Sequence, residues 1–451
     1  MKAKAASEDL QPAGGAAKHF AVGGPFAPGA EDGRPARQQA GRADGRSGTV
    51  LGVLDKMMHA RRSVLALSLG AALALAGCSG STLGDYPGYP STPPGQPTVS
   101  GETIGQGSVR VAMLLPMSGG GSASSIATVF RNTAELALSD FQGADVQILI
   151  KDTGGTAQGA QAAAQAAITE GAELILGPVF APAVGGAGAT ARSSGIPVVA
   201  FSSDEAVASR GVYLLSFLPR SDVARIVSHA AAQGKRSFAA LLPDDTYGAV
   251  VEAAFRQEVG RAGGRIVSIE RYKLTGNDTA DIAAKAGQIA ANAAQIDAIF
   301  VPAGNVAPFV AQTLSTGGVN LGQTRLLGSG QWDSQQVLNA APLTGAWYPG
   351  PDAAGFQAFA SRYQSRYGSQ PPRNASLAYD ATILAAGLVR SAGPARFSER
   401  VLTNRDGFLG IDGVFRFERD GRNERGLAVY EVTGSGSRVI SPAPRSFGSG
   451  S

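Results

Sequence analysis

The fold of this chain is decided by residues 173–204, which read ELILGPVFAPAVGGAGATARSSGIPVVAFSSD. Two short apolar runs, Leu174–Leu176 and Ile196–Phe201, flank a longer segment of small residues. This arrangement is typical of buried parallel strands joined by a crossover helix. Ligands of open α/β sheets bind beyond the carboxyl ends of the strands. We therefore expect a binding crevice beside the turns Gly177–Ala181 and Ser202–Asp204.

Strand and helix patterns alternate along the chain from Val109, where we expect the folded structure to begin. A first set opens with VAMLLP at residues 111–116, and a second set opens with FAALLP at residues 238–243. In each set a strand pattern leads into a polar turn and then a helical pattern. The sequence therefore predicts an α/β fold of two similar lobes, each a parallel sheet flanked by helices, with a hinge between them.

The two lobes are expected to share the chain in separate pieces. We assign residues 108–218 and 348–410 to lobe I, and residues 219–347 and 411–435 to lobe II. The serine- and glycine-rich residues 436–451 are expected to form a loose tail.

Two local patterns give further expectations. Val414–Arg419 and Leu427–Val432 bracket the turn residues Arg419-Asp420-Gly421, which predicts that the two runs pair as a hairpin. Ser221-Asp222 can cap the helix that follows them.

The amino-terminal region carries the pattern of an export signal. Residues 57–77 read MMHARRSVLALSLGAALALAG, in which Arg61-Arg62 precede an apolar stretch of 13 residues. That stretch is short for a membrane span and is typical of a secretory signal peptide. We therefore expect translation to start at Met57 or Met58, and residues 1–56 to be disordered or a start-site artefact.

The end of this signal, Leu75-Ala76-Gly77-Cys78, resembles a bacterial lipobox. The resemblance implies cleavage before Cys78 and acylation of this residue, and therefore a membrane anchor made of lipid. By the sorting rule of such lipoproteins, Ser79 implies the outer membrane more than the inner one. Residues 78–107 are rich in Pro, Gly and Ser, which predicts an extended tether.

Charge and residue counts disfavour several classes of function. The first 77 residues hold 10 of the 39 basic and 6 of the 35 acidic residues, which leaves 29 of each sign. A neutral body gives no electrostatic reason to expect nucleic acid as a partner. Cys78 is the single cysteine and His229 the single histidine after it, so these residue types cannot build a metal site. No cofactor motif is present and no pair of carboxylates stands out, so we expect a protein that is not an enzyme, with a hydrolase as the least favoured alternative.

Six stretches, in this order, resemble one known family. They read VAMLLPMSGG, ILIKDTGGTAQGA, LILGPVFAPAV, GIPVVAFSSD, LLPDDTYGAVV and GIDGVFRFERDGRNERGLAVYEV. From Val109 to Val432 the chain resembles type I periplasmic solute-binding proteins, in the branch that binds leucine and branched-chain amino acids. It is more similar still to the lipoproteins known as penicillin-binding-protein activators, which carry this fold.

The resemblance implies a ligand held between two lobes that are joined by three crossings of the chain. Matching positions place these crossings near Leu218–Asp222, Trp347–Gly350 and Phe408–Gly413. In the family, the turn after Phe201 holds the main-chain groups of an amino acid, and an aromatic residue of the second lobe contacts the ligand. The implied ligand contacts are Ser118, Ser202, Ser203, Asp204, Tyr247 and Gln331.

The chain departs from the family at the group that binds the ligand's ammonium. The second lobe usually offers a glutamate, but Gly328–Trp332 contains no acid. Asp204 is the only acid in its turn and is the best local candidate to pair with a cation, unless the turn serves only as a helix cap. Gln331 and Trp332 either form a wall of the cleft or cover an edge.

Two functions remain open at this stage. The first is a lipid-anchored periplasmic solute-binding component of an amino-acid-type ABC transporter, which captures a small polar ligand and passes it to an ABC permease. The alternative is an outer-membrane lipoprotein that activates a peptidoglycan synthase. Ser79, the tether and the missing acid favour the alternative.

Overall fold

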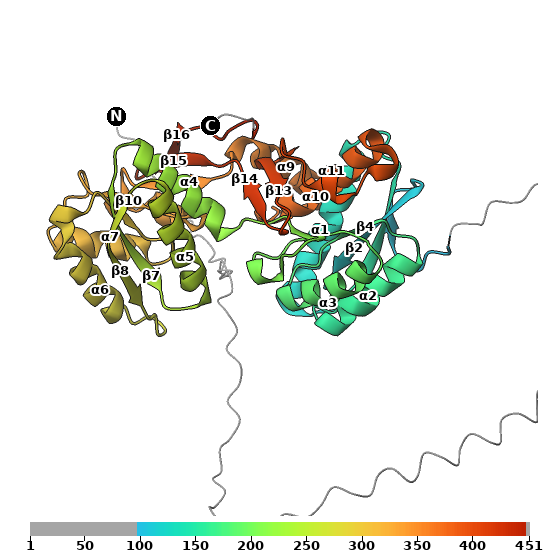
Figure 1. The fold of residues 1–451 in the computed structure, drawn as a ribbon, viewed down its shortest axis with the longest axis horizontal. Coiled ribbons are helices and arrows are strands. Elements are labelled where there is room, and N and C mark those ends of the chain that lie inside the picture. Colours follow the sequence, from blue (N-terminus) through green and yellow to red (C-terminus); the bar gives the residue numbers. More distant parts are fainter. Residues whose placement is uncertain (1–96, 448–451) are drawn as a thin grey trace, which may run out of the picture. The chain divides into compact units, whose positions relative to one another are not determined.

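The computed structural model describes residues 97–447 (Figure 1). In this part of the chain, two mainly parallel sheets each carry helices on both faces, and a small third sheet is inserted in the sequence between two strands of the second sheet, β11 and β15. The α/β class and the parallel sheets flanked by helices are as predicted.

The first sheet has the spatial order β1-β3-β2-β4-β5-β6. The short β1 runs antiparallel to β3, and the other strands are parallel. The strands are β1 (Thr103–Ile104), β2 (Val109–Leu115), β3 (Val146–Asp152), β4 (Leu174–Leu176), β5 (Val198–Ala200) and β6 (Val212–Leu214).

Helices cover both faces of this sheet. Val111 and Met113 of β2 pack on the side of α1 and α10, whereas Ala112 and Leu114 pack on the side of α2 and α3. Successive side chains of a strand point to opposite faces, so a strand covered on both faces reads as an unbroken apolar run. Figure 1 shows α2 and α3 side by side. The helices are α1 (Gly121–Asp140), α2 (Ala157–Thr169), α3 (Ala181–Ser193) and α10 (Ala375–Ser391).

The second sheet has the spatial order β16-β15-β11-β10-β9-β7-β8. Helices α4 and α5 pack on one of its faces, and α6 and α7 pack on the other. The strands are β7 (Ser237–Pro243), β8 (Arg265–Tyr272), β9 (Ala298–Phe300), β10 (Arg325–Leu327), β11 (Trp347–Gly350), β15 (Ala428–Val432) and β16 (Ser437–Ser441). The helices are α4 (Pro219–Ala232), α5 (Thr246–Arg261), α6 (Ala280–Ala290) and α7 (Ala307–Thr316).

The two sheets share one connectivity. The parallel orders β3-β2-β4-β5-β6 and β8-β7-β9-β10-β11 are the same when the strands of each are numbered along the chain. In this order the direction of winding reverses between the first and third strands, and ligands bind at that switch point. The loops that follow β2 and β4, and those that follow β7 and β9, are therefore the places to look for a site.

The third sheet, with the order β12-β13-β14, belongs with the first lobe. Phe415 and Phe417 of β13 lie in the same apolar cluster as the α1 and α10 face of the first sheet. The strands are β12 (Phe408–Gly410), β13 (Gly413–Phe417) and β14 (Asn423–Arg425), and the remaining helices are α8 (Gln335–Leu338), α9 (Ala353–Tyr367) and α11 (Glu399–Leu402).

This packing corrects the predicted crossings and the limits of the lobes. The chain passes from the first sheet to the second between β6 and α4, near the predicted Leu218–Asp222. Trp347–Gly350 is itself a strand of the second sheet, so the return follows it. The third crossing lies between β14 and β15 instead of at Phe408–Gly413, because β13 fills the core of the first lobe.

Three local expectations were wrong. Val414–Arg419 does not pair with Leu427–Val432: β13 pairs with β14 through the predicted turn, and β15 joins the second sheet. The expected loose tail contains β16, which pairs with β15. Folded structure begins before Val109, because β1 adds an antiparallel edge to β3 within the expected tether. The last two errors have the same cause, since β1 and β16 are edge strands, and such a strand is fixed by its neighbour more than by its own sequence.

Gly177 lies in the turn after β4, and its replacement tests how tightly this turn packs against the neighbouring strand β2. Its φ is 84°, and a Cβ at this position would lie 2.5 Å from the carbonyl oxygen of Leu114. Gly177→Ala should therefore lower the free energy of unfolding by about 1–3 kcal/mol or more, measured by urea denaturation. Gly185→Ala is the control, because Gly185 lies in α3 with nothing within 4 Å, and should stabilise the protein by about 0.5–1 kcal/mol. Equal stability of the two variants would contradict the tight turn.

Candidate ligand-binding site

The carboxyl edge of the first sheet holds the predicted Ser118. This residue is exposed in the turn after β2, and its backbone N–H donates to Asp152 Oδ1 at 3.2 Å. Gly154 donates to the same oxygen at 2.8 Å. Although partial burial opposes it, hydrogen bonds from Ser118 and Gly154 hold the pKa of Asp152 below its usual value. Asp152 at the end of β3 is thus an ionised acceptor beside Ser118.

The predicted turn Ser202–Asp204 follows β5 at the same edge. Ser202 is buried, and its Oγ accepts a hydrogen bond from the N–H of Asp204 at 3.1 Å. Asp204 is exposed and caps the short helix Glu205–Val207, because its Oδ1 accepts from the N–H of Ala206 at 2.9 Å. The alternative use of this turn as a helix cap is therefore present in the structure. Ser203 is exposed in the same turn.

The carboxyl edge of the second sheet brings Tyr247 beside the loop that follows β10. Tyr247 lies in the first turn of α5, directly after β7, and its hydroxyl forms a hydrogen bond with Ser329. Ser329 is buried and donates from its Oγ to the carbonyl of Pro302, after β9, at 2.7 Å. Three loops from adjacent strands therefore meet at this edge.

Asp222 of α4 adds an acid to this edge, beside the segment Gly328–Trp332, which has none. The residue was expected to cap a helix, but α4 begins at Pro219 and its N-cap is Leu218. The Oδ2 of Asp222 instead accepts a hydrogen bond from the N–H of Gly330 at 2.8 Å. A Cβ on Gly330 would lie 3.1 Å from that oxygen, so glycine allows the close approach.

The carboxyl group of Asp222 is electrostatically unusual. Burial raises its pKa to about 7, and the hydrogen bond from Gly330 only partly opposes this rise. Burial also raises the pKa of Tyr247, against the effect of its hydrogen bond with Ser329. In the described chain, Asp222 forms no ion pair with Lys, Arg or His. A partly buried carboxyl without a counter-ion is poised to accept a cationic group.

A cluster of charges lies next to the turn Ser202–Asp204. Glu205 has Arg220 of α4 on one side and Arg422 of the β13–β14 turn on the other, each at 3.8 Å. Burial raises the pKa of Glu205, and the two arginines oppose that rise. The cluster connects the first-lobe turn to the start of α4, the helix that carries Asp222.

Three other singled-out residues are placed as follows. Trp332 is fully buried and its Nε1 donates to the carbonyl of Val301 at 2.9 Å, so it belongs to the core of the second lobe. Its neighbour Gln331 is exposed. His229 is buried with its ring edge-on to that of Trp347, and burial lowers its pKa. None of these contacts places a nucleophilic side chain beside a general base.

Other features expected from the sequence fall outside residues 97–447. These are the signal peptide, the lipidated Cys78 and most of the tether. Across the described range, no group of three or more His, Cys, Asp or Glu side chains could hold a metal ion. The helices of that range include none long and apolar enough to cross a membrane.

The sequence model of the periplasmic binding protein family matches residues 108–437, most of the chain. This chain belongs to the periplasmic binding protein family. The predicted resemblance is confirmed at this level, and the family implies a periplasmic location. No curated protein sequence matches the chain.

Solved structures share the fold of this periplasmic binding protein. A putative branched-chain amino acid ABC transporter protein from Rhodospirillum rubrum has a TM-score of 0.65 at 22% identity, over 74% of this chain and 99% of its own. A substrate-binding protein from Desulfitobacterium hafniense in complex with Leu has a TM-score of 0.54 at 17% identity, over 74% and 99%. A solute-binding protein from Rhodopseudomonas palustris in complex with 3,4-dihydroxybenzoic acid has a TM-score of 0.52 at 19% identity, over 75% and 98%.

The pKa of Asp222 predicts how stability depends on pH. Its folded pKa of about 7 lies above the unfolded value of about 3.9, so the folded state binds more protons between these values. Its contribution to stability is therefore complete below about pH 4 and is lost as the pH rises through about 7. Asp222→Asn should lose less stability than the wild type between about pH 4.5 and 7.5, measured by urea denaturation at each pH.

Asp333→Asn is the matched control for this measurement. Asp333 is exposed in the same loop as Gly330, so its replacement should leave the pH dependence of the wild type unchanged. A pH dependence that is the same in all three proteins would show that the carboxyl of Asp222 is not shifted.

Proposed function

We propose that this protein is the solute-binding component of an ABC transporter, that it is anchored in the periplasm by lipid on Cys78, and that it captures a small zwitterion or cation. The observation that carries this proposal is Asp222, a partly buried carboxyl at the carboxyl edge of the second sheet that has no counter-ion among residues 97–447. An ammonium group would repay the cost of ionising a buried carboxyl, as the family's glutamate does from another position.

We assign the carboxylate of the ligand to residues at the carboxyl edge of the first sheet. Ser118 and Ser203 offer exposed hydroxyls beyond the ends of β2 and β5, and hydroxyls and main-chain N–H groups bind a carboxylate. Tyr247 supplies an aromatic face beside Asp222, and Gln331 an exposed amide. A ligand that contacts both sheets would shift the population of the protein towards a closed form. The structure from Desulfitobacterium hafniense with bound Leu supports an amino acid as the ligand class.

Calorimetric titration with a panel of amino acids tests the assignment. Asp222→Asn should weaken the best amino acid by about 30-fold or more, because a buried charged hydrogen bond contributes about 2–5 kcal/mol. Binding of benzoate, which has no cationic group, should be much less affected. Asp333→Asn again serves as the control.

Asp204→Ala separates the two candidate acids. If it weakens the amino acid while Asp222→Asn does not, the ammonium binds at the first-lobe turn, as the sequence alone suggested. Tight binding of an amino acid that neither change affects would contradict both assignments.

The lipid anchor is tested separately. Cys78→Ser should abolish the incorporation of labelled palmitate and leave the precursor unprocessed, because acylation requires the thiol of that residue. Incorporation of palmitate into the Cys78→Ser protein would contradict the proposed anchor. Fractionation of the membranes then tests the expectation of the outer membrane, which rests on Ser79.

Activation of a peptidoglycan synthase is the second candidate function. The proline-rich sequence between Cys78 and the described fold favours it, because such composition is typical of an extended tether that could reach the cell wall. Specific capture of a penicillin-binding protein, together with no binding of any amino acid, would favour this function over transport.

A further inference from the structure

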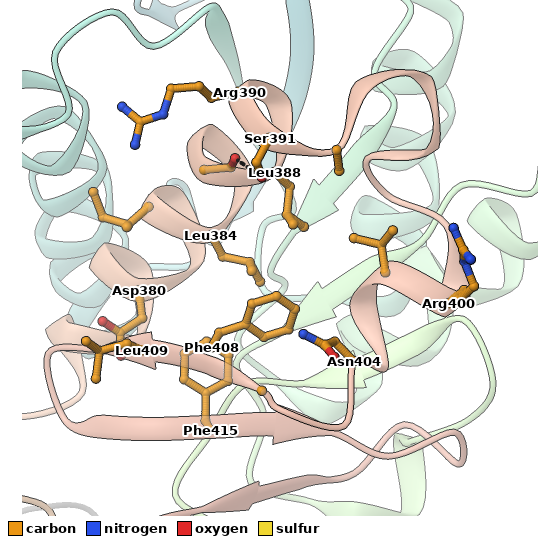
Figure 2. A pocket seen from close by; sticks show the side chains of 15 residues that line it. Asp380, Leu384, Leu388, Arg390, Ser391, Arg400, Asn404, Phe408, Leu409 and Phe415 are labelled. Carbon is orange, nitrogen blue, oxygen red and sulfur yellow. Dashed lines mark hydrogen bonds between the residues drawn. The ribbon is translucent and has the colours of Figure 1, made fainter. Parts of the chain in front are cut away.

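A cavity of about 690 Å³ lies away from the strand ends, between α10, α11 and β12 (Figure 2). None of the predicted ligand contacts forms part of its wall. Its volume is within the range of about 300–1,000 Å³ that is usual for small-molecule sites. We call it the α10 groove.

The floor of the α10 groove is apolar. It is formed by the buried Leu384 and Leu388 of α10 and Phe415 of β13, with Phe408 beside them. Leu409 of β12 is 76% exposed at the rim, more than any other large apolar side chain in residues 97–447. The groove is therefore lined mainly by apolar side chains, with Leu409 exposed at its rim, and such a lining is typical of a small-molecule site.

A helical glycine keeps the groove open. Gly387 lies inside α10, four residues before its last residue, and glycine within a helix costs about 1 kcal/mol relative to alanine. Its φ is helical, and a Cβ at this position would meet nothing within 4 Å. Neither backbone geometry nor helix packing therefore requires glycine here, whereas a larger side chain would fill the groove whose wall it forms.

Charge is distributed unequally along the groove. Figure 2 shows Arg400 and Asn404 at the end opposite to Asp380. In the described chain Arg400 forms no ion pair or hydrogen bond, whereas its neighbours Arg396 and Arg416 are paired with glutamates. The Oδ1 of Asp380 accepts from the N–H of Ile411 at 2.7 Å, and the carboxyl interacts with the charge of Arg425, whereas its Oδ2 is buried and has no hydrogen-bond partner in the described chain.

The polar rim therefore has a free cation. The side-chain oxygen of Asn404 accepts from the N–H of Asp406 at 3.3 Å, which leaves the amide nitrogen of Asn404 to donate. Arg390, also in the wall, lies 4.3 Å over the ring of Phe141 and has no carboxylate partner in the described residues. At the end of the groove that Arg400 and Asn404 line, the unpaired groups of the described chain are donors, and their formal charge is positive.

We propose that the α10 groove is a second binding site, for an amphiphilic monocarboxylate. The apolar body of the ligand lies on Leu384, Leu388 and Phe408, and its carboxylate meets Arg400 and the amide of Asn404. Burial of the apolar body contributes about 25 cal/mol per Å², and the carboxylate selects the orientation.

Decanoate is the test ligand, and decanol and decyltrimethylammonium are its neutral and cationic counterparts. Calorimetry uses the full chain with Cys78→Ser, so that no acyl chain of its own competes. Decanoate should bind saturably at one site, and more tightly than either counterpart. Equal binding of decanol or of the cation would overturn the assignment of the carboxylate.

Three variants locate the binding. Arg400→Ala should weaken decanoate by about threefold to tenfold and leave decanol unchanged. Arg405→Ala is the matched control, because Arg405 is exposed nearby and lies outside the wall of the groove. Gly387→Leu should fold with a normal helical spectrum and abolish binding of decanoate. Binding that survives Gly387→Leu would overturn the proposal.

Two further results would also overturn it. If an amino acid displaces decanoate, or if Asp222→Asn abolishes its binding, decanoate occupies the site at the strand ends. If sedimentation shows a dimer that Leu409→Ser dissociates, the groove is an interface between copies of the chain.

Discussion

Both lobes are organised by one constraint, which is that a parallel sheet must be covered by helices on both faces. Every residue of the central strand β2 except Arg110 is buried, and so are the short central strands β4, β5 and β9. Polar side chains can leave such strands only at their ends. The shared connectivity then opens the carboxyl ends of β2 and β4, and of β7 and β9, at a switch point in each sheet.

The acid that contacts the loop after β10 comes from helix α4. The loop after β10 has glycine and serine where the resemblance leads one to expect an acid, and α4 places Asp222 against that loop. Solved structures at 17–22% identity share the fold of this chain, but that level of identity does not transfer their ligand contacts.

Buried charges also hold the third sheet against the first lobe. Arg425 of β14 donates to the carbonyl of Ser216 at 3.0 Å, and Asn423 donates to the same oxygen at 2.9 Å. Asp412, fully buried, pairs with Arg373 at 2.6 Å. Buried charges are costly unless they are paired, so these contacts favour one register of the sheet. Through Ser216 they also position the segment that leads into α4 and Asp222.

The sequence alone determined the features that depend on local residue patterns, which are the strands, the helices between them and the turns at the strand ends. Apolar runs of the right length gave most strands of both sheets, and small-residue and amphipathic segments gave the helices between them, because burial on two faces leaves a continuous signal. The repeated LLP turns predicted two similar lobes, and the order of six motifs indicated the family. The turns that carry Ser118, Ser202 and Tyr247 were placed at strand ends for the same reason.

Only the tertiary structure decided which distant residues meet. Asp222 and Gly330 are 108 positions apart, and no local pattern relates them. The pairing of β13 with β14, the edge strands β1 and β16, and the α10 groove likewise depend on neighbours brought in by the fold. Local sequence specifies the periodicity with which residues are buried. The partner of an edge strand, by contrast, depends on contacts that exist only after packing. The raised pKa of a carboxyl likewise depends on desolvation, which requires the folded structure.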